Sequence, residues 1–267
     1  MVAFLSELNG LDLWATDIGN AYLEARTSEL LFIVAGPEFE NLEGHMLVIY
    51  KALYGLCSSG LHWHEHFSAC LRDMGFFPCK AEPDIWMRRV DDHYEYIATY
   101  IDDLAISSKD PKAITDTLMN KYNFKLKGTG EIEYHLGMSF CRNDRNELCI
   151  SPQRYIEKMV DNYKRLFAES PSHRSQSTLE SNDHPEIDSP KILGEDDIQK
   201  YQSLIGAMQW AISIGHFDIA VHVMTMSSFR ASPRHGHLEQ VKHMVGYLSK
   251  FRFAELCILT DEPDLLT

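Results

Sequence analysis

The sequence lacks the features that would place this chain in a membrane or outside the cell. No apolar run reaches the ~20 residues needed to span a bilayer, although 45% of the 267 residues are apolar. The first fifteen residues contain Glu7 and Asp12 but no Lys or Arg, so the basic start of a secretory signal is missing. We therefore expect an intracellular protein that is not secreted and has no membrane partner.

Paired cysteine motifs are also missing. The six cysteines form no CxxC pair and no zinc-ribbon spacing, so neither a disulfide framework nor a structural zinc site is expected. Scattered, mostly buried thiols are the better interpretation. His62 and His66 would lie one helical turn apart, a spacing that can bind zinc, but no third ligand accompanies them.

Basic residues are scarce, with 25 Lys and Arg against 39 Asp and Glu and a net charge of −14. Nucleic-acid backbones are bound chiefly through Lys and Arg, so this balance argues mildly against tight binding of a polyanion. Part of the acidic excess lies between 168 and 197, a segment rich in Ser and Pro and poor in aromatic residues. This composition is typical of a solvated linker.

Before the linker, predicted strands alternate with predicted helices. Apolar runs that indicate strands or hairpins occupy 11–18, 30–37, 46–55, 84–90, 95–101, 104–108, 133–143 and 147–152. Helical spacing marks 61–76, where Leu61, Phe67, Leu71 and Met74 would share a face, and 112–124. A helix or turn is expected over 20–26. After the linker, helical spacing covers 198–214, 217–229 and 237–251. The sequence therefore predicts an α+β fold followed by a helical part.

Two adjacent acids interrupt an apolar extended run, in the segment ATYIDDLAIS. This pattern predicts a tight hairpin with Asp102 and Asp103 at its tip. Adjacent side chains on a strand point apart, so Asp102 would face a bound ion while Asp103 supports from the side. A third carboxylate is available from Asp17, which ends another apolar run and is followed by Gly19 and Asn20.

Three carboxylates suit a hard divalent cation such as Mg²⁺, which takes oxygen ligands and keeps several waters. Two such ions ~4 Å apart can activate a hydroxyl and stabilise a leaving pyrophosphate. The alternative is a solvated turn, which is what an isolated Asp-Asp pair usually forms. The apolar flanks on both sides favour the metal site, but spacing alone leaves both interpretations open.

Several ordered motifs resemble the reverse transcriptase of copia-type LTR retrotransposons, from about Leu11 to Phe251. The resemblance is carried by TDIGNAYL, KALYGL followed by Trp63, YIDD, EYHLGM, ISPQRYIEKM, YQSLIGAMQW, FDIAV and HLEQVKHMVGYL, in that order. YIDD alone would be a weak signal, whereas so many motifs in the right order make a strong one.

This resemblance implies a fold and a function. The fold would be a polymerase palm, an antiparallel sheet with packed helices, over 1–150. A thumb-like region would begin at 151–167, an acidic linker would span 168–197, and a helical connection-like region would cover 198–267. The function would be RNA-directed DNA polymerase activity, transferring nucleotides from dNTP to a primer 3′-OH with two Mg²⁺ ions, or Mn²⁺. Partners would be an RNA or DNA template with its primer, and the remainder of a retroelement polyprotein in the cytoplasm or a virus-like particle.

The resemblance also assigns site residues. Asp17, Asp102 and Asp103 match the catalytic and metal-binding triad, and Ile18 would offer its carbonyl to a metal. The nucleotide-binding positions would be Asn20 and Ala21 through main-chain amides, Tyr22 as a steric gate against ribonucleotides, and Ile101 beside the primer terminus. Gly137 and Met138 would belong to the primer grip. Tyr22 and Met138 could equally be core residues.

The sequence departs from the family pattern in three places. No Lys or Arg precedes Asp17, where members carry a basic fingers subdomain. KALYGL continues with Cys57-Ser58-Ser59-Gly60-Leu61-His62 instead of a segment containing Lys, Pro and Arg. No acidic set of a ribonuclease H appears before Thr267. An alternative function is therefore a truncated, non-catalytic retroelement relic that acts at most as a binding module; a metal-dependent nuclease is a weaker one.

Overall fold

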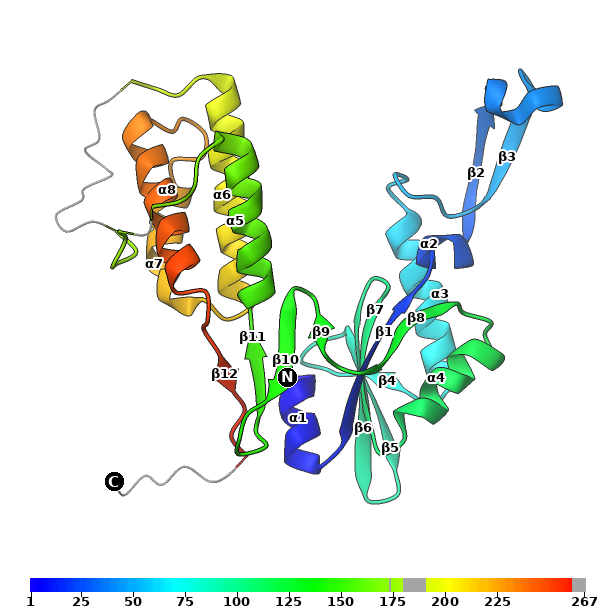
Figure 1. The fold of residues 1–267 in the computed structure, drawn as a ribbon. Coiled ribbons are helices and arrows are strands. Elements are labelled where there is room, and N and C mark those ends of the chain that lie inside the picture. Colours follow the sequence, from blue (N-terminus) through cyan, green and yellow to red (C-terminus); the bar gives the residue numbers. More distant parts are fainter. Residues whose placement is uncertain (173, 180–190, 261–267) are drawn as a thin grey trace. The chain divides into compact units, whose positions relative to one another are not determined.

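A computed structural model describes residues 1–172, 174–179 and 191–260 (Figure 1). The chain divides into two compact units, Met1–Ile132 and Glu133–Leu259. Both contain antiparallel strands and helices, so the predicted α+β class is confirmed. The expected boundary after residue 150 lies inside the second unit.

The first unit is built on a six-stranded antiparallel sheet, in the order β4-β5-β6-β7-β1-β8. Its strands are β1 (Asp12–Ile18), β4 (Phe77–Pro78), β5 (Ile85–Val90), β6 (His93–Tyr100), β7 (Asp103–Ser108) and β8 (Leu126–Glu131). Its helices are α1 (Val2–Asn9), the single turn α2 (Ala21–Glu24), α3 (Ser59–Asp73) and α4 (Pro111–Asn120). Each predicted strand of this region forms, whereas α1 was not predicted.

Helices cover both faces of the central strand β7. Leu104 and Ile106 belong to the core cluster that includes Phe67 of α3 and Ile114 of α4. Side chains alternate along a strand, so Ser107 points to the opposite face, where its hydroxyl donates to Ser6 of α1 at 3.1 Å. Because both faces are covered, nearly every side chain of β7 is buried.

Helix α3 buries most of the predicted face but not its first residue, Leu61. Phe67 and Leu71 are in the core as expected, but Leu61 is 58% exposed and Trp63 is 2% exposed. The prediction for Leu61 was wrong because the apolar spacing admits two overlapping stripes. Trp63 has the larger apolar surface, and burying it is the more favourable solution.

A hairpin formed by β2 (Arg26–Val34) and β3 (Met46–Lys51) makes a separate two-stranded sheet, with the short 3₁₀ helix η1 (Pro37–Leu42) at its end. One face carries exposed apolar side chains that alternate along both strands: Leu30, Phe32, Val34, Met46, Val48 and Tyr50. We call this set the hairpin face. Two-stranded hairpins are marginally stable when alone, and apolar surface of this extent favours association.

The second unit combines a small sheet with a helical bundle. The sheet has the order β12-β11-β10-β9, with β9 (Tyr134–His135), β10 (Met138–Arg142), β11 (Leu148–Ser151) and β12 (Leu256–Cys257). The helices are α5 (Gln153–Phe167), α6 (Glu195–Ser213), η3 (Phe217–Ile219), α7 (Ala220–Ser227) and α8 (His235–Lys250). The predicted hairpin and the predicted helices all form.

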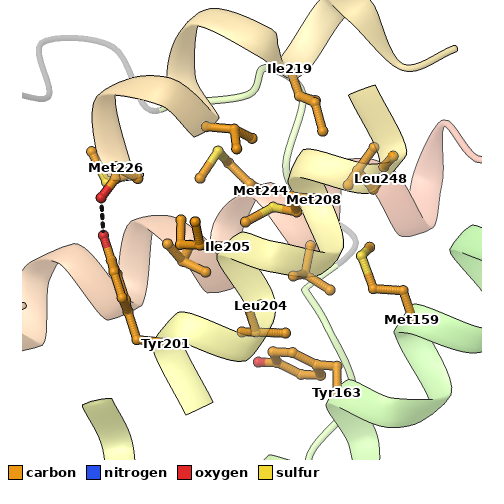
Figure 2. Packing of buried hydrophobic residues seen from close by; sticks show 14 of the residues in the cluster. Met159, Tyr163, Tyr201, Leu204, Ile205, Met208, Ile219, Met226, Met244 and Leu248 are labelled. Atoms are coloured by element: carbon orange, nitrogen blue, oxygen red, sulfur yellow. Dashed lines mark hydrogen bonds between the residues drawn. The ribbon is translucent and has the colours of Figure 1, made fainter. Parts of the chain in front are cut away.

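An apolar core joins the helices of the second unit (Figure 2). Leu204 and Met208 of α6 and Met244 of α8 are fully buried in it. The hydroxyl of Tyr201 donates to the carbonyl of Met226 at 2.6 Å, which satisfies the polar end of a buried aromatic side chain. Among the described helices, none is both long and apolar enough to cross a membrane.

Three expectations need correction, two about the cysteines and one about the linker. Cys149 and Cys257 form a disulfide because β11 and β12 place them directly opposite each other, with Cα atoms 4.1 Å apart. Of the four free cysteines only Cys70 is buried, so the prediction of mostly buried thiols was also wrong.

Of the expected linker, residues 173 and 180–190 lie outside the described residues. Ser175 and Thr178 are buried, so these positions are not solvated.

The Glu95 carboxylate anchors a polar cluster inside the first unit. It accepts hydrogen bonds from Arg88 Nη2 at 2.6 Å and from Ser108 Oγ at 2.5 Å, and it is 6% exposed. We predict that Glu95→Ala destabilises the fold by about 2–4 kcal/mol, because it leaves buried donors without an acceptor. Urea unfolding followed by tryptophan fluorescence measures this change. Asp116→Ala, which breaks an exposed pair with Lys112, is the control and should cost less than about 0.5 kcal/mol. Equal losses would contradict the prediction.

The hairpin face should drive self-association of the chain. Leu30 and Tyr50 are 79% and 76% exposed, so lysines there would leave the core intact. We predict that Leu30→Lys with Tyr50→Lys lowers the oligomer fraction measured by light scattering at least several-fold. The control is Asn120→Lys with Ser170→Lys, which adds the same charge at exposed polar positions. An equal decrease in the control would assign the effect to net charge instead of to this face.

Candidate active site

The turn between β6 and β7 carries the first two residues of the candidate site. Tyr100 pairs with Asp103 across the hairpin, so Ile101 and Asp102 form a two-residue loop. Ile101 has φ of 56°, in the left-handed region. A β-branched residue rarely adopts this conformation, because its Cβ substituents crowd the backbone. The tip of the hairpin is therefore a strained position that its surroundings must hold.

Strand β1 brings the third aspartate to this tip. Asp17 is the direct antiparallel partner of Asp103, which places the two side chains on the same face of the sheet. The next residue, Ile18, donates its backbone N–H to the carbonyl of Asp102 at 2.8 Å. Asp17, Asp102 and Asp103 thus meet at one end of two central strands.

The three carboxylates interact unfavourably with one another. Burial raises the pKa of the Asp103 carboxyl above its ordinary value, and the charges of Asp102 and Asp17 raise it further. The pKa of Tyr54 is raised by burial and then by Asp102, with smaller effects from Tyr22 and Asp17. A bound cation would relieve this repulsion.

The donors at this end of the sheet are those that hard cations prefer. Carboxylate oxygens from three aspartates fit Mg²⁺ or Mn²⁺, which take oxygen ligands. The ligand atoms of the three aspartates do not all lie within 4.8 Å of one another. Within the described chain, the group of three ligand side chains lying within 4.8 Å of one another is Cys149, Glu255 and Cys257, in the second unit. The aspartates therefore form an open set that a cation would draw together.

The residues after Asp17 turn sharply into α2. Asn20 has φ of 58°, which asparagine tolerates better than most residues, and Ala21 is buried. The ring of Tyr22 lies 4.7 Å from that of Tyr54, centroid to centroid. This contact fixes the Tyr22 ring beside the aspartates but leaves it partly exposed, so Tyr22 is not a fully buried core residue.

A lysine that the sequence analysis missed lies at the same edge. Lys127 of β8 is the strand partner of Asp17. A Cβ on Gly19 would lie 3.0 Å from Lys127 Cε and 3.2 Å from the Lys125 carbonyl oxygen, so glycine is what permits this close approach. The signal in the sequence was the pair Lys125 and Lys127 after a helix, but nothing local indicated that this strand would pair with β1.

A pocket of about 280 Å³ opens on the side of the hairpin tip. Aromatic side chains dominate its lining, which includes Tyr22, Trp63, Phe67, Trp86, Tyr100 and Ile101. His64 Nε2 lies 3.5 Å from Asp84 Oδ1 among the polar lining residues. His62 contacts Ser28 through its Nε2 atom instead of pairing with His66 as a metal site would require.

Gly137 and Met138 lie in the second unit, whereas the other predicted site residues all lie in the first. Leu136 and Gly137 both have positive φ, 49° and 89°, and they form the tight turn between β9 and β10. A Cβ on Gly137 would lie 3.2 Å from Trp210 Nε1, so the turn packs closely on α6 of its own unit.

Comparison with known proteins gives the same family throughout. A family model described as reverse transcriptase (RNA-dependent DNA polymerase) matches residues 2–170. A putative transposon Ty5-1 protein of Saccharomyces cerevisiae is 28% identical over 238 residues, which cover 87% of this chain and 74% of that protein.

Two plant relatives are much longer than this chain. The retrovirus-related Pol polyprotein from transposon RE1 of Arabidopsis thaliana is 24% identical over 87% of this chain, and the match covers 16% of the polyprotein. The corresponding polyprotein from transposon TNT 1-94 of Nicotiana tabacum is 24% identical over 96% of this chain, which covers 20% of it. The family match over residues 2–170 includes all six strands of the first unit's sheet and the three aspartates. The chain therefore belongs to the reverse transcriptase (RNA-dependent DNA polymerase) family, and it resembles the copia-type retrotransposon members of that family.

Proposed function

We propose that the chain is an RNA-directed DNA polymerase domain that transfers nucleotides from dNTP to a primer 3′-OH. The observation that carries this proposal is the meeting of Asp17, Asp102 and Asp103 at one end of β1 and β7. Phosphoryl transfer depends mainly on positioning and on stabilising negative charge, and both require a rigid support. The centre of a six-stranded sheet is such a support.

Asp17, Asp102 and Asp103 would hold two Mg²⁺ ions, or Mn²⁺, with the carbonyl of Ile18 as a further ligand. Bound there, the ions would supply activation of the primer hydroxyl and charge stabilisation of the pyrophosphate. The main-chain amides of Asn20 and Ala21 would hold the triphosphate. Tyr22, fixed against Tyr54, would exclude a ribonucleotide 2′-OH, and Ile101 would lie beside the primer terminus.

We assign the first unit to a polymerase palm and the second to a thumb-like and connection-like region, in which Gly137 and Met138 would form the primer grip. The plant relatives are named as polyproteins, so we further propose that this chain works within a longer retroelement polyprotein inside the cell, on an RNA or DNA template with its primer.

A second candidate is a non-catalytic retroelement relic that binds a partner without turnover. It is favoured by the net charge of −14 and by the segment 57–62, which contains no Lys or Arg. The two candidates differ in whether the aspartates support turnover, which the next experiment decides.

We predict primer extension that depends on Asp102. Purified chain with a primed RNA template, Mg²⁺ and dNTPs should extend the primer, and Asp102→Asn should lower the rate by roughly 10²-fold or more, because a carboxylate that would hold the charge-stabilising metal ions is lost. Asp116→Asn, which changes a half-buried aspartate on α4 away from the three site aspartates, should extend like wild type. If wild type and Asp102→Asn extend the primer equally, or if neither extends it, the proposal that this chain catalyses the reaction is contradicted. The non-catalytic binding module would then be the remaining candidate.

The crowded carboxylates should also cost stability in the absence of metal. The folded state raises the pKa of Asp103, so its ionised form at pH 7 is less favourable in the folded chain than in the unfolded chain. We predict that Asp103→Asn raises metal-free stability by about 0.5 kcal/mol or more, and that Mg²⁺ stabilises wild type more than this variant. Thermal unfolding with EDTA and with Mg²⁺ measures both. A lower melting temperature for Asp103→Asn in EDTA would contradict the prediction.

A further inference from the structure

The strained tip of the catalytic hairpin is held from outside by one side chain. The indole N–H of Trp63 donates a hydrogen bond of 2.7 Å to the carbonyl of Ile101. Ile101 is the residue with φ of 56°, and its carbonyl belongs to the peptide that leads into Asp102. We propose that Trp63 is a positioning residue for the reaction, which fixes the backbone of Ile101 so that Asp102 stays beside the paired Asp17 and Asp103. This inference rests on the proposed function and deepens it.

Both carbonyls of the loop have donors, and the donors come from different elements. Trp63 of α3 donates to the Ile101 carbonyl, and Ile18 of β1 donates to the Asp102 carbonyl at 2.8 Å. Consecutive peptides of a two-residue loop can rotate only if such bonds break. The two bonds therefore fix the peptide on each side of Asp102. Fixing both peptides also fixes the direction in which the Asp102 side chain leaves the backbone.

The tryptophan is itself immobilised. Trp63 is 2% exposed, and its ring stacks on Phe67 at 5.2 Å with an interplanar angle of 14°. The edge of Phe124 meets it at 5.8 Å. At the start of the same helix, Ser59 Oγ donates to the Leu53 carbonyl at 2.6 Å. A donor held by two aromatic contacts on an anchored helix can hold a backbone conformation that Ile101 would otherwise leave.

The chemistry of the side chain distinguishes this role from simple packing. Phenylalanine in place of Trp63 would keep an aromatic ring in the core but remove the N–H that reaches Ile101. A packing role predicts that the loss follows the buried volume removed, whereas a positioning role predicts that it follows the hydrogen bond. Glycine in place of Ile101 adopts positive φ without strain, so it should reduce the dependence on Trp63.

The test is a double-mutant cycle on the full chain with Trp63→Phe, Ile101→Gly and both together. Phe76→Leu is the packing control, because Phe76 is equally buried in the same core and does not line the pocket at the hairpin tip. We expect Trp63→Phe to lower kcat at least 10-fold and to raise the Mg²⁺ concentration for half-maximal rate several-fold, with the KM for dNTP changed less than 2-fold. Phe76→Leu should change kcat less than 3-fold, and in the Ile101→Gly background Trp63→Phe should cost less than 3-fold.

Hydrogen exchange gives a readout that needs no turnover. Loss of the Trp63 bond should speed exchange of the Ile18 amide at least 10-fold, because its acceptor is the loop carbonyl of Asp102, while Phe76→Leu leaves that amide unchanged. Unchanged exchange at Ile18 in Trp63→Phe, additive effects in the cycle, or equal losses in Trp63→Phe and Phe76→Leu would each overturn the inference. Absence of extension by wild type would overturn the proposed function alone, and the Ile18 exchange would still decide whether Trp63 holds the hairpin.

Discussion

Strand β1 pairs with β7 from Asp12 opposite Ser108 to Asp17 opposite Asp103, at the centre of the six-stranded sheet. Because the register is continuous, a shift by one residue would move the apolar side chains of both strands from the core to the other face. The same register that buries Ile18 and Leu104 therefore brings Asp17 against Asp103. The position of the carboxylates is thus a consequence of how the core is packed.

This arrangement costs free energy, and contacts elsewhere in the first unit offset that cost. The carboxylates repel one another, and Ile101 adopts a backbone conformation that costs a β-branched residue about 1–2 kcal/mol. The hydrogen bond from Trp63 and the covered faces of β7 hold these groups in place. Strain and like charges commonly collect at functional sites, where the surrounding structure over-determines them. The first unit fits that pattern, since the left-handed Ile101 and the three repelling carboxylates lie within one hairpin and its strand neighbour.

Part of this site could be predicted from the sequence and part could not. The run ATYIDDLAIS predicts the hairpin because apolar flanks and turn acids are local signals, and Asp17 follows from the end of another apolar run. The approach of Lys127 to Gly19 and the bond from Trp63 to Ile101 depend on tertiary packing between distant segments. Apolar spacing placed Leu61 in the core instead of Trp63, because spacing defines a stripe but not which of two overlapping stripes is buried. The pairing of Cys149 with Cys257 likewise depends on two strands 108 residues apart.

The acidic composition argues against binding a polyanion, but the effect of each acidic residue depends on its distance from the bound phosphate. At physiological salt the Debye length is ~8 Å, so exposed charges farther away are largely screened from a phosphate at the site. The acids that matter most are then Asp17, Asp102 and Asp103, and their effect on an approaching phosphate reverses once divalent cations neutralise them. Lys127 lies beside Gly19 at the same edge and adds a positive charge that the whole-chain balance hides. A net charge of −14 therefore limits how strongly the chain holds a long nucleic acid through its surface, but it does not oppose a nucleotide held through metal ions.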